Sequence, residues 1–154
     1  LGREVEMSRA FLDIHRMRMG SRLEYSIEVP GALKCRELPP MILISLVENA
    51  VKHGVDPCCE AGRIVIRARE EGPRLQVSVS DTGEGITPKK GTGVGLSNIR
   101  ERLKTLYGAS ARLVLEENTP RGVVATLDLP APEHPMEESA DNSAEDAARI
   151  SRAA

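Results

Sequence analysis

Apolar side chains recur at every second position in several short parts of the chain. Between residues 22 and 29 the apolar positions are Leu23, Tyr25, Ile27 and Val29. A period of two predicts a half-buried β-strand. Further strands are predicted for residues 63–70, 74–81, 111–117 and 122–130. The first two of these are separated by a short segment containing Gly and Pro, which predicts a hairpin.

Three other segments carry apolar residues at helical spacing, and helices are predicted for residues 5–18, 40–54 and 95–108. The apolar positions of the first are Val5, Phe11, Leu12, Ile14 and Met17. One face of the last holds Leu96, Ile99, Leu103 and Leu106. Strands and helices together predict an α+β fold. We expect a two-layer sandwich of one mixed, mostly antiparallel sheet with its helices on one face.

The helix predicted for residues 40–54 has two chemically different sides. A projection at about 100° per residue places the apolar side chains on one arc, which holds Leu43, Leu46, Val47, Ala50 and Val51. The opposite arc holds Ser45, Glu48, Asn49, Lys52 and His53. An amide oxygen suits Mg²⁺, which takes one or two protein oxygens plus phosphate oxygens. Lysine and histidine can meet a phosphate. A solvated helix face is the alternative interpretation.

The stretch "DTGEGITPKKGTGVGLSNI" at residues 81–99 holds two glycine clusters. Asp81 ends a predicted strand, and its carboxylate, which only accepts hydrogen bonds, matches the amino group of adenine. Gly83 and Gly85 let a base approach the backbone closely, although an ordinary Asx turn explains them equally well. The second cluster, residues 91–95, runs into a helix, where backbone N–H groups and the helix dipole favour phosphate.

Composition narrows the class of ligand, the redox compartment and the part of the chain expected to be ordered. The 154-residue chain contains two Tyr, one Phe and no Trp, which disfavours a nucleic-acid surface built on base stacking. Three cysteines, two of them adjacent, favour a reducing compartment. The longest apolar run is far shorter than the roughly 20 residues that span a bilayer. Residues 131–154 are acidic and have little to bury, which predicts a disordered tail.

Three boxes in register carry a resemblance to a known superfamily. "LVENAVKHG", "DTGEGI" and "GTGVGLSNIRERL" resemble the N box and the two glycine boxes of the GHKL ATPases. Within that superfamily the chain is similar to sensor histidine kinases of the LytS/AlgZ type. The segment "FLDIHRMRMGSRLEYSIEV", the double proline before the N box and "NIRERLKTLYG" share this likeness. The resemblance covers about residues 4–130.

The resemblance implies the Bergerat fold, ATP and Mg²⁺ as ligands, and Asn49 as the magnesium ligand. It implies that the nucleotide contacts are Asn49, Lys52, His53, Asp81, Gly83, Gly85, Ile86, Gly91, Thr92, Gly93, Gly95 and Leu96. Asn49 and Lys52 are the expected catalytic residues, together with Glu48, which could orient a water at the metal. The lid is only "ITPKK", so Lys89 and Lys90 are expected near the phosphates.

Two residues depart from the family pattern. Ser45 stands one turn before Asn49, where many members have Asn or Glu, so the water-activating carboxylate of the gyrase-like ATPases is missing. Val123 stands where the family often has a threonine that touches adenine through water. These departures leave open a degenerate module that serves dimer or partner contacts.

The resemblance also implies how the domain fits into a larger protein. None of His15, His53 and His134 lies in a context like the family's phosphoacceptor helix. Residues 1–20 are expected to end a helix continuing from an upstream dimerisation and phosphoacceptor region, and residues 21–130 to form the catalytic domain. A dimeric parent anchored in the bacterial inner membrane through an upstream region, a cytoplasmic domain and a response-regulator partner are expected. An anti-sigma-factor serine kinase is a further alternative.

Overall fold

The computed structural model describes residues 1–58, 60–85 and 94–131. Its five strands are β1 (Leu23–Glu28), β2 (Gly62–Glu71), β3 (Arg74–Asp81), β4 (Arg112–Glu117) and β5 (Val123–Pro130). Its α-helices are α1 (Gly2–Met19), α2 (Ile42–Asn49) and α3 (Val94–Tyr107). Calls that fall on residue 59, residues 86–93 or the predicted tail from residue 132 lie outside the described residues. No helix in the described ranges is both long enough and apolar enough to cross a bilayer.

The strands form one mixed sheet in the order β1-β2-β3-β5-β4. β1 and β2 are parallel, and the other three neighbouring pairs are antiparallel. β2 and β3 form the predicted hairpin, with Glu71 opposite Arg74. β3 is therefore the central strand, and both of its edges pair with neighbouring strands.

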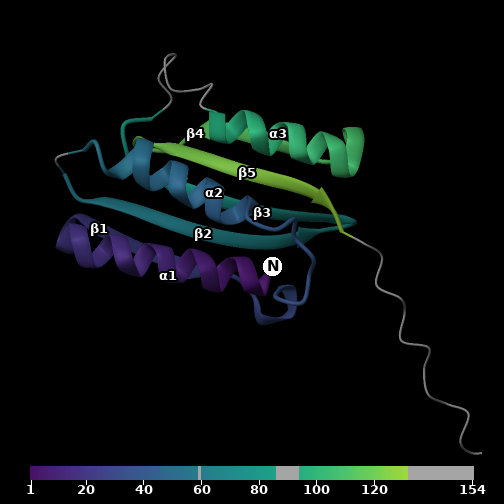
Figure 1. Ribbon diagram of the computed structural model, residues 1–154, viewed down its shortest axis with the longest axis horizontal. Coiled ribbons are helices and arrows are strands. Elements are labelled where there is room, and N and C mark those ends of the chain that lie inside the picture. Colours follow the sequence, from purple (N-terminus) through teal and green to yellow (C-terminus); the bar gives the residue numbers. More distant parts are fainter. Residues whose placement is uncertain (59, 86–93, 132–154) are drawn as a thin grey trace, which may run out of the picture.

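All three helices lie on the same side of this sheet (Figure 1). The alternation in β3 follows from this arrangement, because Leu75, Val77 and Val79 are buried under the helices while the residues between them are half-buried. The same core includes Leu12 of α1 and Leu103 of α3. The predicted α+β sandwich with helices on one face is confirmed.

Some apolar positions assigned to buried helix faces are exposed. Leu106 was expected beside Leu103, but it is 54% exposed, whereas Leu103 is 1% exposed. The half-buried Tyr107, one full turn after Leu103, packs against the core instead. In α1, two of the apolar positions that predicted the helix, Ile14 and Met17, are exposed at 66% and 87%, whereas Val5 and Leu12 are buried. Periodicity alone therefore predicted the helices but not every residue that packs in the core.

The helix predicted for residues 40–54 is two elements. α2 ends at Asn49, and the chain continues as a π-helical turn, η3 (Ala50–Val55). Its wider hydrogen-bonding pattern is common at functional sites. The two predicted arcs nevertheless persist: Leu43 and Val51 are buried, and Lys52 is exposed. The expectation of one continuous α-helix was wrong over its last turn.

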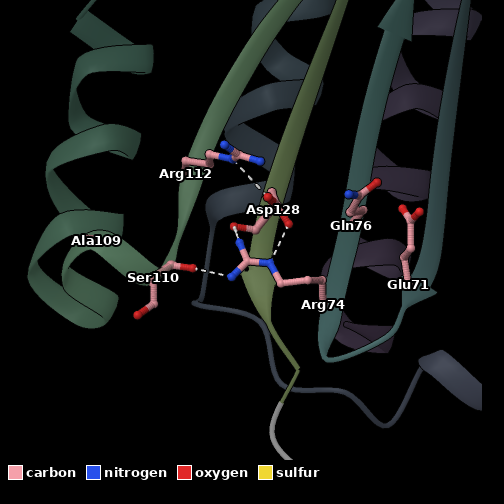
Figure 2. A pocket seen from close by; sticks show the side chains of 7 residues that line it. All are labelled: Glu71, Arg74, Gln76, Ala109, Ser110, Arg112 and Asp128. Atoms are coloured by element: carbon pink, nitrogen blue, oxygen red, sulfur yellow. Dashed lines mark hydrogen bonds and ion pairs between the residues drawn. The ribbon is translucent and has the colours of Figure 1, made fainter.

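On the face of the sheet away from the helices, Asp128 joins three strands (Figure 2). Arg74 Nε on β3 donates to Asp128 Oδ1 at 2.9 Å, and Arg112 Nε on β4 donates to Oδ2 at 3.0 Å. Arg74 also donates to the carbonyl oxygens of Ser110 and Asp128. These residues line a hollow of about 450 Å³. Because every donor nitrogen of Arg74 is already paired, the cluster serves as a clamp between strands.

We expect Asp128→Asn to lower the free energy of unfolding by about 1–3 kcal/mol at pH 7, because Arg74 and Arg112 lose a charged acceptor that is itself buried. The hydrogen bond from Arg74 holds the pKa of Asp128 below its ordinary value of 3.8. Its stabilisation is therefore present above pH 3.8 and lost as the pH falls through the folded-state pKa. Denaturant unfolding from pH 7 to pH 3 should show the two proteins converging.

The matched control for this clamp is Glu28→Gln. Glu28 accepts hydrogen bonds from Arg67 on the same sheet, and its pKa is likewise lowered, chiefly by Arg67. This pair is exposed to solvent, so we expect no measurable change in stability. Equal losses in the two variants would show that burial does not set the strength of the Asp128 clamp.

Candidate functional site

Asp81 is buried at the end of the central strand, and the glycine backbone of Gly54, Gly83 and Gly122 that packs around it is called the recess. Asp81 is the last residue of β3 and is 5% exposed. The backbone N–H of Gly83 donates to Asp81 Oδ1 at 2.8 Å, and Asn118 Nδ2 donates to the Asp81 carbonyl oxygen at 2.7 Å. The predicted position at a strand end is confirmed. The carboxylate is held by main-chain N–H donors, without a cationic partner among these contacts, and Asn118 holds the backbone of the same residue.

Glycine backbone packs around Asp81 at distances that no side chain would permit. A Cβ atom at Gly54 would lie 2.7 Å from Asp81 Oδ1. A Cβ atom at Gly83 would lie 2.1 Å from the Gly54 carbonyl oxygen, and one at Gly122 would lie 2.0 Å from the Asp81 carbonyl oxygen. Real contacts of Cβ atoms are never so short, so the recess requires glycine on three separate chain segments.

Burial raises the pKa of the Asp81 carboxyl above its ordinary value, because desolvation disfavours the charged form. Hydrogen bonds from the backbone N–H groups of Gly83 and Val123 act in the opposite direction. A carboxylate in such surroundings gains from any further N–H donor that enters the recess. Perturbed acids of this kind are typical of functional sites.

Asn49 connects α2 with the start of α3. Its Nδ2 donates to the Ser45 carbonyl oxygen at 2.8 Å, which leaves Oδ1 as the amide's acceptor atom. A Cβ atom at Gly95 would lie 3.2 Å from Asn49 Nδ2, so the backbone of α3 passes directly against the amide. Ser45 Oγ donates to the Met41 carbonyl oxygen at 2.6 Å. The N box and the second glycine box therefore meet at Asn49.

The remaining predicted residues fall into three groups. Lys52 and Glu48 are exposed, and His53, Gly85 and Leu96 are half-buried. Gly85 has φ +83°, a conformation that favours glycine in this turn. The other predicted contacts, Ile86, Gly91, Thr92 and Gly93, and the lid lysines Lys89 and Lys90, lie outside the described residues.

Sequence reasoning missed three parts of the recess. Gly54 was predicted only as the last residue of the helix at 40–54 and Gly122 as the first residue of the strand at 122–130, whereas both lie against Asp81. Asn118, which donates to the Asp81 backbone, lies between two predicted strands and was given no role. Gly54 had one available signal, because it ends the N-box motif. Nothing in the order of residues marks Asn118.

The arrangement suits a ligand with two chemically different ends. A buried carboxylate in a glycine-lined recess accepts hydrogen bonds from a flat group that carries N–H donors. Asn49 offers an amide oxygen, and the following turn offers the exposed Lys52 and the half-buried His53. Gly54 follows His53 directly and lies against Asp81, so the two groups of residues lie on adjacent segments.

Comparisons with known proteins agree with this geometry. Residues 38–133 match the family described as histidine kinase-, DNA gyrase B- and HSP90-like ATPase. Sensor histidine kinase BtsS of Escherichia coli K12 is 36% identical over 115 residues, covering 71% of this chain and 20% of BtsS. Sensor protein LytS of Enterococcus faecalis is 29% identical over 145 residues, covering 84% of this chain and 24% of LytS. The chain thus spans about a fifth to a quarter of these relatives.

Solved structures share the fold at low sequence identity. The catalytic domain of histidine kinase ThkA superposes with a TM-score of 0.66 at 19% identity, covering 85% of this chain and 93% of that domain. Mycobacterial sensor histidine kinase MprB gives a TM-score of 0.56 at 20% identity, covering 82% of this chain and 93% of that chain.

Proposed function

Because the chain belongs to the histidine kinase-, DNA gyrase B- and HSP90-like ATPase family, we propose that it is the ATP-binding catalytic domain of a sensor histidine kinase. It delivers the γ-phosphoryl group of ATP to a histidine elsewhere in the whole protein, from which a response regulator receives it. The observation that carries this proposal is Asp81, a buried acid walled by glycine backbone.

Asp81 holds the adenine end of the nucleotide in this proposal. Its carboxylate accepts a hydrogen bond from the exocyclic amino group, while Gly83 and Gly85 allow the ring to lie against the backbone. Gly83 N–H already occupies one lone pair of Oδ1, and further lone pairs of the carboxylate remain for the amine. Leu96 and Ile86 belong to the proposed nucleotide contacts.

The donor set at the other end fits a magnesium polyphosphate. Asn49 Oδ1 is a hard oxygen ligand of the kind that Mg²⁺ takes alongside phosphate oxygens. Lys52 and His53 are proposed to contact the phosphates, and Gly91, Thr92, Gly93 and Gly95 belong to the proposed phosphate contacts. Magnesium, when bound, neutralises charge that develops on the phosphate oxygens. Glu48, exposed and adjacent to Asn49, is proposed to orient a water at the metal.

The proposed reaction is an in-line displacement at the γ-phosphorus. The bond from that phosphorus to the β-γ bridging oxygen breaks, a bond to an imidazole nitrogen forms, and ADP leaves. The residues of this chain position the nucleotide and stabilise charge. Ser45 donates its hydroxyl to its own helix and supplies no carboxylate to activate water, which favours transfer to a histidine over hydrolysis.

The whole protein is proposed to be a homodimer with a response regulator as its partner. Its catalytic domain is proposed to be cytoplasmic, with any membrane attachment in another part of the protein. One solved relative of the same fold is a histidine kinase in complex with a response regulator protein, ThkA with TrrA. That likeness supports the proposed partner class by analogy of fold.

Titration calorimetry with the purified domain tests the nucleotide part of the proposal. With Mg²⁺ present we expect ATP to bind at least about 10-fold more tightly than GTP, because a carboxylate accepts from the adenine amine but faces a carbonyl oxygen in guanine. Absence of heat with ATP, or equal affinity for the two nucleotides, would refute the assignment of Asp81 to adenine.

A further inference from the structure

Glu4 on α1 is a buried acid that holds the first turn of α2. It is 5% exposed, and its carboxylate accepts two backbone hydrogen bonds from the other helix. Oε1 accepts from Met41 N–H at 2.7 Å, and Oε2 accepts from Leu43 N–H at 3.1 Å. A residue 37 positions earlier in the chain thus caps α2.

α2 has no side-chain cap of its own, which gives these two bonds their importance. Met41, the residue before the helix, adopts a left-handed conformation with φ +64° and makes no capping bond with its side chain. The first N–H groups of a helix lack partners within it, and a negative charge at that end is favourable. Glu4 supplies both the acceptors and the charge.

α1 also contacts the far end of the same helical segment. Arg18 Nη2 donates to Asp56 Oδ1 at 3.2 Å, and Asp56 directly follows η3. α1 therefore contacts the segment that carries Asn49 near both of its ends, although the Arg18–Asp56 pair is exposed and contributes little, so Glu4 supplies the buried contact. Asn49 lies six positions after Leu43, about 9 Å along the helix.

We propose that Glu4 is a positioning residue for Asn49, and this inference rests on the proposed role of Asn49 at the magnesium phosphate end. The carboxylate fixes where α2 begins, and two turns of helix transmit that position to the amide oxygen. Displacement of a ligand by a fraction of an ångström weakens metal coordination, so loss of the cap acts on the magnesium end of the site. Asp81, on the central strand, keeps its place.

The test compares ATP affinity with Mg²⁺ and with EDTA. The ratio of these affinities measures how much magnesium contributes to binding. We expect Glu4→Gln, which leaves one acceptor and removes the charge, to reduce this ratio by about 10-fold while the affinity in EDTA changes little. Glu4→Asp, which keeps the charge on a shorter side chain, should retain more of the ratio than Glu4→Gln.

Val5→Ala is the matched control. Val5 is 1% exposed on the same turn of α1, and its truncation loosens the core without touching the N–H groups of α2. It should lower the unfolding midpoint and leave the magnesium ratio intact. An unchanged ratio in Glu4→Gln, or an equal fall in both variants, would overturn the role of Glu4. Failure of the unmodified domain to bind ATP would instead remove the proposed function itself.

A second measurement needs no variant. Coupling between two sites is reciprocal, so binding of magnesium ATP should tighten the contacts at Glu4. Hydrogen exchange followed by NMR should show slower exchange of the Met41 and Leu43 amides with magnesium ATP than with ATP in EDTA. Equal exchange in the two conditions would contradict the coupling.

Discussion

Asp81→Asn should weaken ATP binding by about 100-fold while the domain stays folded. The substitution removes a charged acceptor, worth about 1.5–3 kcal/mol in a hydrogen bond, and can present an NH₂ group to the adenine amine. Asparagine keeps the size of the side chain and retains an oxygen for the Gly83 N–H. Calorimetry with magnesium ATP gives the affinity, and thermal unfolding without nucleotide reports the fold.

The stability of this variant has a defined dependence on pH. Because the folded-state pKa of Asp81 is raised above the ordinary value of 3.8, ionisation of the carboxyl costs stability as the pH rises through that interval. Asparagine carries no such cost. The free energy of unfolding of Asp81→Asn relative to the unmodified domain should therefore increase between pH 4 and pH 8. A variant that loses both stability and binding at neutral pH would show that Asp81 serves the fold rather than the ligand.

Gly83→Ala should lower the free energy of unfolding by about 3 kcal/mol. The new Cβ atom would lie 2.1 Å from the Gly54 carbonyl oxygen and 2.3 Å from Gly54 Cα. Both are backbone atoms, so relief requires that the last turn of η3 move away from β3. Because that movement opens the recess around Asp81, ATP affinity should fall as well. Urea denaturation and calorimetry measure the two effects.

Gly31→Ala is the control for this substitution. Gly31 lies in an exposed 3₁₀ turn, and a Cβ atom there meets nothing within 4 Å. Alanine at this position restricts the backbone without causing a steric clash, so we expect the free energy of unfolding to change by no more than about 0.5 kcal/mol. Comparable losses of stability in the two variants would mean that the clash between the new Cβ at position 83 and the Gly54 backbone is not the cause.

The sequence predicted the elements of this fold better than their details. Strict alternation around Val77 identified residues 74–81 as a strand, because its side chains alternate between a buried and a half-buried face of the sheet. Periodicity could not distinguish an α-helical turn from a π-helical one, so the change after Asn49 was missed. The choice between Leu106 and Tyr107 for the core depends on how α3 packs, which no local pattern contains.

The candidate site divides in the same way. Asp81 and Asn49 were predicted because their chemistry is visible in the residue type and in the neighbouring motif. Gly122 and Asn118 were missed because their roles arise from contacts that close only in three dimensions. Glu4, in the first turn of α1, has no sequence feature that relates it to α2. Its role follows only from two hydrogen bonds over a separation of 37 and 39 residues.

The recess around Asp81 also bears on the order of folding. Gly54, Gly83 and Gly122 come from three segments that become neighbours only when β5 has paired with β3. Contacts so distant along the chain carry a loop-closure cost that the rest of the structure must offset. A chain with α1, α2 and the β2–β3 hairpin formed but β5 unpaired would contain Asp81 and lack the wall that Gly122 provides. We therefore expect the chain to bind its ligand only when the sheet is complete, and a nascent or partly unfolded chain not to bind it.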